Sequence, residues 1–100
     1  MTYQIEFHDL VSEDYDEAYM KYSLIQEELG ERFAAAVRKR AKQISENPEH
    51  YGEKARKGYR EVKVEGFPYS IVYRIYKRKK TVFVNSIHHE KKHPRKKYRK

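Results

Sequence analysis

The sequence Tyr-Ser-Ile-Val-Tyr-Arg-Ile-Tyr at residues 69–76 decides the fold of this chain. β-Branched and aromatic side chains dominate it and only Ser70 and Arg74 are strongly polar, which is typical of a strand in the middle of a sheet. Phe67-Pro68 precedes it, and proline suits the start of a strand because no ladder hydrogen bond is needed there. We therefore predict a central strand over Tyr69–Tyr76.

Three further strands are predicted around this one. Residues 59–64 and 3–8 alternate apolar with polar side chains, the period of a half-buried strand, and residues 81–87 are rich in β-branched side chains. The connectors at 65–68 and 77–80 are short enough for hairpins. The last three strands therefore form a predicted antiparallel meander, joined by the first strand.

Two helices are predicted between the first and second strands. Ser12 has the character of a helix N-cap, because acidic residues follow it in the first turn, where the helix dipole favours anions. Apolar residues then recur every three or four positions up to Leu29, and Gly30 is predicted to end or hinge this helix. The second helix is predicted from about Glu31 to Glu46, where Asn47-Pro48 stops it.

The predicted fold class is therefore α+β. The element order is β-α-α-β-β-β, a mostly antiparallel four-stranded sheet with an α-helical hairpin packed on one face and a polar loop over residues 50–57. One hundred residues are enough for one domain. We expect a single domain over residues 1–100, in which residues 88–100 form a basic, histidine-rich C-terminal segment.

The net charge of +8 is concentrated toward the C-terminal end. Residues 88–100 hold seven Lys/Arg and one acid, whereas residues 1–49 hold eleven acids and six bases. This distribution predicts an acidic helical side and a basic side. Clustered cations indicate a polyanionic partner, because each phosphate contact releases condensed counterions.

The composition excludes several classes of protein. The absence of cysteine excludes disulfides, thiolate catalysis and thiolate zinc sites. No apolar stretch approaches the roughly 18 residues of a membrane span, and the N-terminus lacks the pattern of a signal peptide. We expect a soluble cytoplasmic protein with no membrane association and no cofactor.

Cations on the sheet and in the C-terminal segment are predicted to bind the target or a nucleic acid. Lys63 and Arg74 lie on different predicted strands and are expected to point to the open face opposite the helices, beside the basic segment. The alternative is a solvated sheet face on which long cationic side chains cover tyrosine rings. The candidate binding residues are Lys63, Arg74, Lys91, Lys92, Arg95, Lys96 and Tyr98.

Histidines near the C-terminus suggest metal binding or proton transfer. His89 and His93 have a helical i, i+4 spacing, but no acid or thiolate is well placed to complete a site, so no metal is predicted. A histidine among cations has a lowered pKa and is a neutral base near pH 7. In a nuclease, His88 or His89 would take the proton of a 2′-hydroxyl while Lys92 or Arg95 stabilised charge on the phosphate. The alternative is a solvated basic tail that only binds.

A series of short motifs resembles the RelE/ParE superfamily of toxins from bacterial type II toxin–antitoxin systems. The motifs are Asp14-Tyr15-Asp16-Glu17-Ala18, Leu29-Gly30-Glu31-Arg32-Phe33, Ile44-Ser45-Glu46-Asn47-Pro48, Gly58-Tyr59-Arg60, Phe67-Pro68-Tyr69-Ser70-Ile71-Val72-Tyr73-Arg74 and Ile87-His88-His89-Glu90-Lys91-Lys92-His93-Pro94. The Phe-Pro-Tyr entry and the spacing of His89, Lys92 and Pro94 are more similar to the ParE-like, plasmid-stabilisation branch. The resemblance implies the same fold as the one predicted above.

The resemblance implies two different activities. RelE-like toxins cleave mRNA in the ribosomal A site, whereas ParE-like toxins poison DNA gyrase. Lys63 matches a strand lysine of the nucleases, but Ser70 stands in place of their central-strand arginine and Glu61 in place of another lysine. Both changes remove positive charge, so the resemblance favours a growth-inhibiting toxin that binds gyrase. The alternatives are a ribosome-dependent, metal-independent endoribonuclease and a non-toxic basic nucleic-acid-binding domain.

The resemblance also implies a protein partner. A cognate antitoxin, usually encoded beside the toxin, is expected to neutralise it in an oligomeric complex. An acidic, partly disordered segment of that antitoxin would cover the basic face, and charge pairing and burial of apolar side chains would offset the cost of ordering it.

Overall fold

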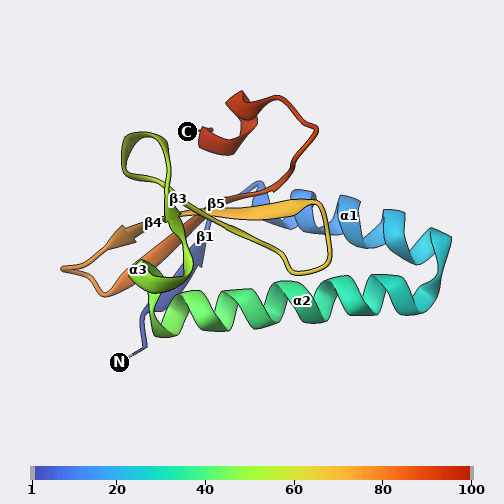
Figure 1. Cartoon of the computed structure of the whole chain (residues 1–100), viewed down its shortest axis with the longest axis horizontal. Coiled ribbons are helices and arrows are strands. Elements are labelled where there is room, and N and C mark those ends of the chain that lie inside the picture. The colour runs from blue at the N-terminus through green and yellow to red at the C-terminus, as the bar shows by residue number, and fades with distance from the viewer. Residues whose placement is uncertain (1, 100) are drawn as a thin grey trace.

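A computed structural model describes residues 2–99. The strands and helices are β1 (Gln4–Phe7), α1 (Val11–Ile25), α2 (Glu27–Glu46), α3 (Pro48–Tyr51), β2 (Glu53–Lys54), β3 (Arg60–Lys63), β4 (Tyr69–Tyr76) and β5 (Thr81–His89), with short 3₁₀ turns η1 (Arg56–Gly58) and η2 (Pro94–Tyr98). The α1–α2 hairpin covers one face of the sheet and the C-terminal end of the chain lies over the other (Figure 1). The predicted α+β class is confirmed.

Strand β4 is the central strand that the sequence predicts. It pairs antiparallel with β3 on one side and with β5 on the other, and β1 adds to β5 as a parallel strand. The sheet is therefore mostly antiparallel, in the order β1-β5-β4-β3-β2. It has five strands instead of the predicted four, because the two-residue β2 pairs with β3.

The segment predicted as a polar loop over residues 50–57 is structured instead. It contains the end of α3, all of β2 and the start of η1. Two side chains of the sheet hold it in place. The buried Tyr73 hydroxyl donates to the carbonyl of Pro48 at 2.6 Å, and Arg60 donates to the carbonyls of Glu49 and Gly52. These partners are distant in the sequence, so the local composition predicts only a loop.

Helix α1 begins before the predicted Ser12 cap. The residue ahead of its first turn is Leu10, and no side chain caps the helix. The preceding turn supplies the polar contacts, because His8 Nδ1 accepts the N–H of Leu10 and the His8 carbonyl accepts the N–H of Val11. The first helical turn is acidic, as predicted. The turn at His8–Leu10 leads into the helix, and no serine side chain caps it.

The hairpin turns at Gln26 and not at the predicted Gly30. Gln26 has an extended backbone with φ −164° and ψ 129°, and it separates α1 from α2. Gly30 lies inside α2, where a Cβ atom would collide with the Ser23 hydroxyl of α1. The glycine is therefore required for close approach of the two helices, and the second helix starts earlier than predicted.

The core lies between the hairpin and the sheet. Phe33 of α2 is completely buried, and its ring centroid lies 5.2–5.5 Å from those of Tyr22, Phe67 and Tyr69. Ile44 of α2 and Val82 of β5 are also completely buried. Burial of each such side chain stabilises the fold by about 1.5–3 kcal/mol, so these contacts fix the hairpin on the sheet.

No helix within residues 2–99 has both the length and the apolar character needed to cross a membrane.

Candidate functional site

One face of the sheet carries no helix. The register aligns Lys63, Ser70 and His88 across β3, β4 and β5, and it aligns Glu61 with Val72 and Ser86 in a second row. Because side chains alternate along a strand, these two rows share one face, and their neighbours Val62 and Ile71 face the core. We call this surface, made of Glu61, Lys63, Ser70, Val72, Ser86 and His88, the open face.

After β5 ends at His89, residues 90–99 of the C-terminal segment fold back over the open face (Figure 1). The carbonyl of Lys97 accepts hydrogen bonds from Asn85 Nδ2 and from Ser86 Oγ, both on β5. His88 and His89 belong to β5, so the basic end of the chain begins as a strand. The segment is therefore a packed layer and not a dangling tail.

Glu61 anchors this layer to β3. Its carboxylate accepts from Lys97 Nζ at 2.9 Å and from the Tyr98 hydroxyl at 2.8 Å. Burial by itself raises the pKa of Glu61, but the hydrogen bonds from Lys97 and Tyr98 and the charge of Lys97 outweigh it and hold the pKa below its ordinary value. Glu61 is thus engaged by the protein's own C-terminal segment.

Asp14 anchors the same layer to α1. Arg99 donates two hydrogen bonds to its carboxylate, at 2.6 and 3.2 Å, and the Ile87 N–H donates a third at 3.0 Å. The Asp14 and Arg99 side chains are only 17% and 18% exposed. Lys92 pairs with Glu17 at 3.1 Å, but this pair is solvent-exposed and contributes about 0–1 kcal/mol.

Arg74 also lies on the side of the C-terminal segment. Its guanidinium lies 4.3 Å from the centroid of the Tyr59 ring and donates to the carbonyl of Lys57. The Tyr59 ring is in turn 4.9 Å from the Tyr98 ring. Arg74 and Tyr98 are therefore brought together through Tyr59, which matches the alternative in which cationic side chains cover tyrosine rings.

His88 is buried beneath the segment. The residue is only 4% exposed, and its Nε2 lies 3.1 Å from the carbonyl of His93. Burial is the main cause of a lowered pKa at His88, and the positive charges of Lys97 and Lys92 lower it further, against opposing effects of the His93 carbonyl and Glu61. The segment therefore covers the His88 ring on the open face.

His88 and His89 point to opposite sides of the sheet. His89 is the register partner of Tyr69, and the two rings meet edge to face at 4.9 Å on the core side. His93 accepts the N–H of Arg95 through Nδ1, at the start of η2. The three histidines thus occupy three separate environments. Within residues 2–99, no group of three His, Cys, Asp or Glu side chains is arranged to hold a metal ion.

The remaining candidate cations are solvent-facing. The side chains of Lys63, Lys91, Arg95 and Lys96 make no hydrogen bond or ion pair to residues 2–99, so their charges face solvent. By contrast, Lys92, Lys97 and Arg99 each pair with a carboxylate. The C-terminal segment therefore presents fewer unpaired charges than its composition suggests.

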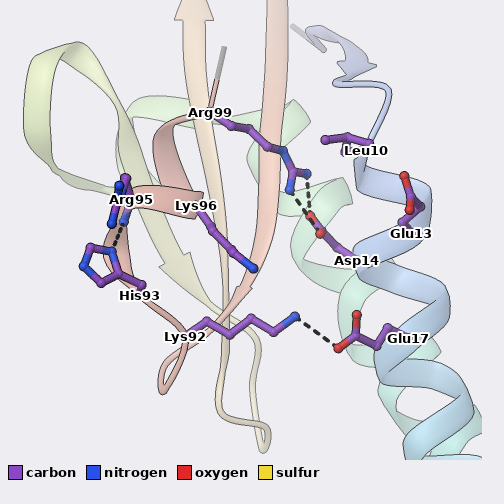
Figure 2. Close-up of a pocket in the computed structure, with 9 residues that line it drawn as sticks. All are labelled: Leu10, Glu13, Asp14, Glu17, Lys92, His93, Arg95, Lys96 and Arg99. Atoms are coloured by element: carbon purple, nitrogen blue, oxygen red, sulfur yellow. Dashed lines mark hydrogen bonds and ion pairs between the residues drawn. The ribbon is translucent and has the colours of Figure 1, made fainter.

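A groove separates α1 from the C-terminal segment (Figure 2). It has a volume of about 660 Å³. Acids of α1 form one wall, bases of the segment form the other, and the Arg99–Asp14 and Lys92–Glu17 pairs cross it. The lining residues are Leu10, Glu13, Asp14, Glu17, Lys92, His93, Arg95, Lys96 and Arg99.

The family model described as the ParE toxin of the type II toxin–antitoxin system parDE matches residues 5–94. The chain belongs to the ParE toxin family. The match spans the sheet, the hairpin and the start of the C-terminal segment, and it confirms the resemblance to the RelE/ParE superfamily. This ParE-family chain is therefore a toxin of the type II class.

Solved structures related to this ParE-family toxin share its fold. The chromosomal ParDE system of P. aeruginosa has a TM-score of 0.75 at 19% identity, covering 88% of this chain and 96% of that chain. The RelBE2 complex of Mycobacterium tuberculosis has a TM-score of 0.67 at 22% identity, and the match covers 89% of this chain and 92% of that chain. A mutant of E. coli RelE in the free state has a TM-score of 0.66 at 19% identity, and the match covers 91% of this chain and 86% of that chain. No curated protein sequence matches the chain.

The predicted division into an acidic helical side and a basic side is wrong in detail. The acids Asp14 and Glu17 lie on α1 and face the C-terminal segment, where they neutralise its cations. The solvent face of α2 carries charges of both signs, because four bases and four acids are exposed there: Arg32, Arg38, Lys39, Lys42, Glu27, Glu28, Glu31 and Glu46. Net charge along the sequence does not describe the surface, because opposite charges that are far apart in the chain meet in the fold.

Sequence reasoning missed the anchors of the C-terminal segment in this ParE-family toxin. Asp14 and Glu61 hold the layer, and Tyr59 joins Arg74 to Tyr98. Asp14 reads in the sequence as an ordinary first-turn acid. The polar Ser70 and Arg74 within the central strand were the sequence feature that could have predicted polar contacts on one face of the sheet.

The stability of this toxin is expected to fall as the pH drops below about 6.5, the ordinary pKa of histidine. In that range the unfolded chain binds a proton that the folded protein takes up only at lower pH, because burial lowers the pKa of His88. Replacing His88 with Gln should make the free energy of unfolding depend less on pH. Urea unfolding at about pH 7.5 and about pH 5.5, roughly one pH unit on either side of 6.5, measures this dependence. A slope identical to wild type would contradict the assignment; His89, whose pKa is also lowered first by burial and then by Lys21, supplies the remainder.

Proposed function

We propose that this protein inhibits bacterial growth by binding DNA gyrase in the cytoplasm, and that it does not cleave RNA. One observation carries the proposal. The open face, where the related nucleases hold cations around the scissile phosphate, has Ser70 and Glu61 at the decisive positions, and the C-terminal segment covers it. The membership of the ParE toxin family supports the same conclusion.

The geometry of the candidate catalytic groups argues against a nuclease. His88 is buried under the segment and His89 faces the core side of β5, so neither ring is exposed on the open face as a general base. A general base must come within hydrogen-bonding reach of the hydroxyl proton. Lys92 is paired with Glu17, which reduces the positive charge available for a developing phosphate charge.

The unpaired cations supply a surface for association instead. Lys91 and Arg95 are exposed on the C-terminal segment, and Lys63 is exposed on β3. Exposed charges of one sign accelerate encounter with an oppositely charged partner and set its orientation. Gyrase engaged with DNA is a large acidic target, so these three residues are proposed as target-binding residues.

The partner that neutralises the toxin is proposed to be a cognate antitoxin. A hollow of about 460 Å³ between the start of α1 and α2 has six apolar or aromatic lining residues, Phe7, Val11, Tyr15, Val37, Ala41 and Ile87, beside the polar His8, Asp9, Ser12, Asp16 and Arg38. Phe7 is 55% exposed there. An amphipathic antitoxin segment would bury this surface with its apolar face and pair its acidic residues with the exposed cations.

Gyrase binding is tested by a supercoiling assay with the purified protein. We expect inhibition and accumulation of cleaved DNA–gyrase complexes, with no mRNA cleavage in a translating extract. Arg95→Gln and Lys91→Gln should each weaken inhibition by about threefold to tenfold at low salt. Lys42→Gln, the same charge change on the far side of α2, is the matched control and should retain full inhibition.

Two results would contradict this function. Cleaved mRNA together with unchanged gyrase activity would identify the protein as an endoribonuclease. Normal growth of bacteria that produce the soluble protein without an antitoxin identifies the non-toxic nucleic-acid-binding domain.

A further inference from the structure

Two buried polar atoms where the C-terminal segment meets β5 lack a partner within residues 2–99, and an exposed cation of the segment lies near them. His88 Nδ1 and Arg99 Nε are both buried and make no hydrogen bond. The Lys96 ammonium makes no ion pair, and Figure 2 shows it extending into the space between the Arg99–Asp14 and Lys92–Glu17 pairs. A buried polar atom without a partner is destabilising, so a group from outside the chain is expected to satisfy His88 Nδ1 and Arg99 Nε.

The contacts of His88 define what its free nitrogen needs. Its Nε2 lies 3.1 Å from the carbonyl of His93, and a carbonyl oxygen only accepts hydrogen bonds. Nε2 therefore carries the hydrogen in the neutral ring, and Nδ1 presents a lone pair. The group that completes this site must donate a hydrogen bond to Nδ1. Arg99 Nε and Lys96 Nζ are donors, so the same group must also accept.

The three residues line one small cavity of about 20 Å³, large enough for a single hydroxyl or water. This cavity shares Asp14, Lys92, Lys96 and Arg99 with the 660 Å³ groove between α1 and the segment. The groove is in the size range of small-molecule sites, about 300–1,000 Å³. The cavity is thus the inner end of a groove that is open to solvent.

We propose that this groove binds inorganic phosphate, which still carries a P–OH at neutral pH. The anionic oxygens accept from Lys96 Nζ and Arg99 Nε, and the P–OH of the protonated group reaches inward and donates to His88 Nδ1. The nearby acids do not repel it fully, because Arg99 neutralises Asp14 and Lys92 neutralises Glu17. Glu13, Arg95 and Lys96 line the groove without an ion pair to residues 2–99, and of these three Lys96 alone also lines the inner cavity.

The hydroxyl requirement makes the site selective. Hydrogen phosphate keeps one O–H at neutral pH, whereas the sulfate dianion has the same shape and charge but no O–H. Sulfate bound here would leave His88 Nδ1 facing another lone pair. We expect phosphate to bind at least about tenfold more tightly than sulfate, the factor that one unmade buried hydrogen bond gives.

The test is a titration of the ¹⁵N-labelled full chain, followed by NMR at constant ionic strength and pH 7. Inorganic phosphate, adenosine monophosphate and sulfate are added separately. Phosphate should shift the amides of Ile87, Lys96 and Arg99 and the His88 Nδ1 resonance, with sulfate about tenfold weaker. Adenosine monophosphate at pH 7 is largely a dianion without a P–OH, so it should bind as weakly as sulfate, and binding as tight as that of phosphate would overturn the proposal.

Matched variants separate a site from general attraction between charges. Lys96→Gln should weaken phosphate binding by about fivefold or more, whereas Lys91→Gln, which removes the same charge outside the groove, should leave it nearly unchanged. Equal binding of phosphate and sulfate, equal losses in the two variants, or no binding of either anion would overturn the proposal. Neither gyrase binding nor its absence affects these readings, because the measurement needs only the isolated chain.

Discussion

Replacing Phe33 with alanine is expected to lower the free energy of unfolding by about 3–5 kcal/mol. Phe33 is completely buried, and four aromatic rings surround it at centroid distances of 5.2–5.9 Å, those of Tyr15, Tyr22, Phe67 and Tyr69. Removing the ring loses both apolar burial and these contacts, and it leaves a cavity between the hairpin and the sheet. A domain of this size has a total stability of about 5–15 kcal/mol, so the variant is expected to be close to unfolding.

Urea unfolding followed by circular dichroism measures this change. Leu24→Ala is the control, because Leu24 is 83% exposed at the end of α1 and its truncation should change stability by less than about 0.5 kcal/mol. A cost below about 1 kcal/mol for Phe33→Ala would mean that the hairpin does not pack on the sheet through this ring.

Replacing Asp14 with alanine is expected to cost about 2–4 kcal/mol and to release the C-terminal segment from α1. The carboxylate accepts from Arg99 twice and from the Ile87 N–H once, and its removal leaves a mostly buried guanidinium and a backbone donor unpaired. The cost is below that of a fully buried pair, because both side chains retain some solvent contact.

Hydrogen exchange distinguishes release of the segment from general destabilisation. In Asp14→Ala, amides of residues 96–99 and of Ile87 should exchange faster than those of the central strand β4. Asp16→Ala removes an exposed acid two residues further along the same helix and should leave both exchange and stability close to wild type. Unchanged protection of the segment in Asp14→Ala would show that Arg99 does not hold it.

Local patterns predicted the elements whose signals are local. The β-branched and aromatic run of β4 marks a central strand wherever it occurs, and Asn47-Pro48 ends α2 because proline restricts the residue before it. Gly30 shows the limit of this reasoning. A glycine suits a helix end and also a close helix–helix contact, and only the position of Ser23 on the neighbouring helix decides between them.

The candidate site depends on contacts that local patterns do not carry. Arg99 and Asp14 are 85 positions apart, and Tyr98 and Glu61 are 37 positions apart. The sequence therefore indicated a basic C-terminal segment beside the sheet, but not that acids of α1 and β3 hold it down. His88 and His89 are adjacent in the sequence, yet alternation along β5 sends them to opposite faces.

The parallel pairing of β1 with β5 has a consequence for the order of events during protein synthesis. β5 lies between β1 and β4, so the first strand has no neighbour until the last strand has left the ribosome. At about 5–20 residues per second, the N-terminal half waits several seconds for that strand. The Asp14–Arg99 contact forms later still, since Arg99 follows β5 in the chain and lies 85 positions after Asp14. The toxin surface is thus incomplete while the chain is being translated. An antitoxin encoded beside the toxin can fold during this interval.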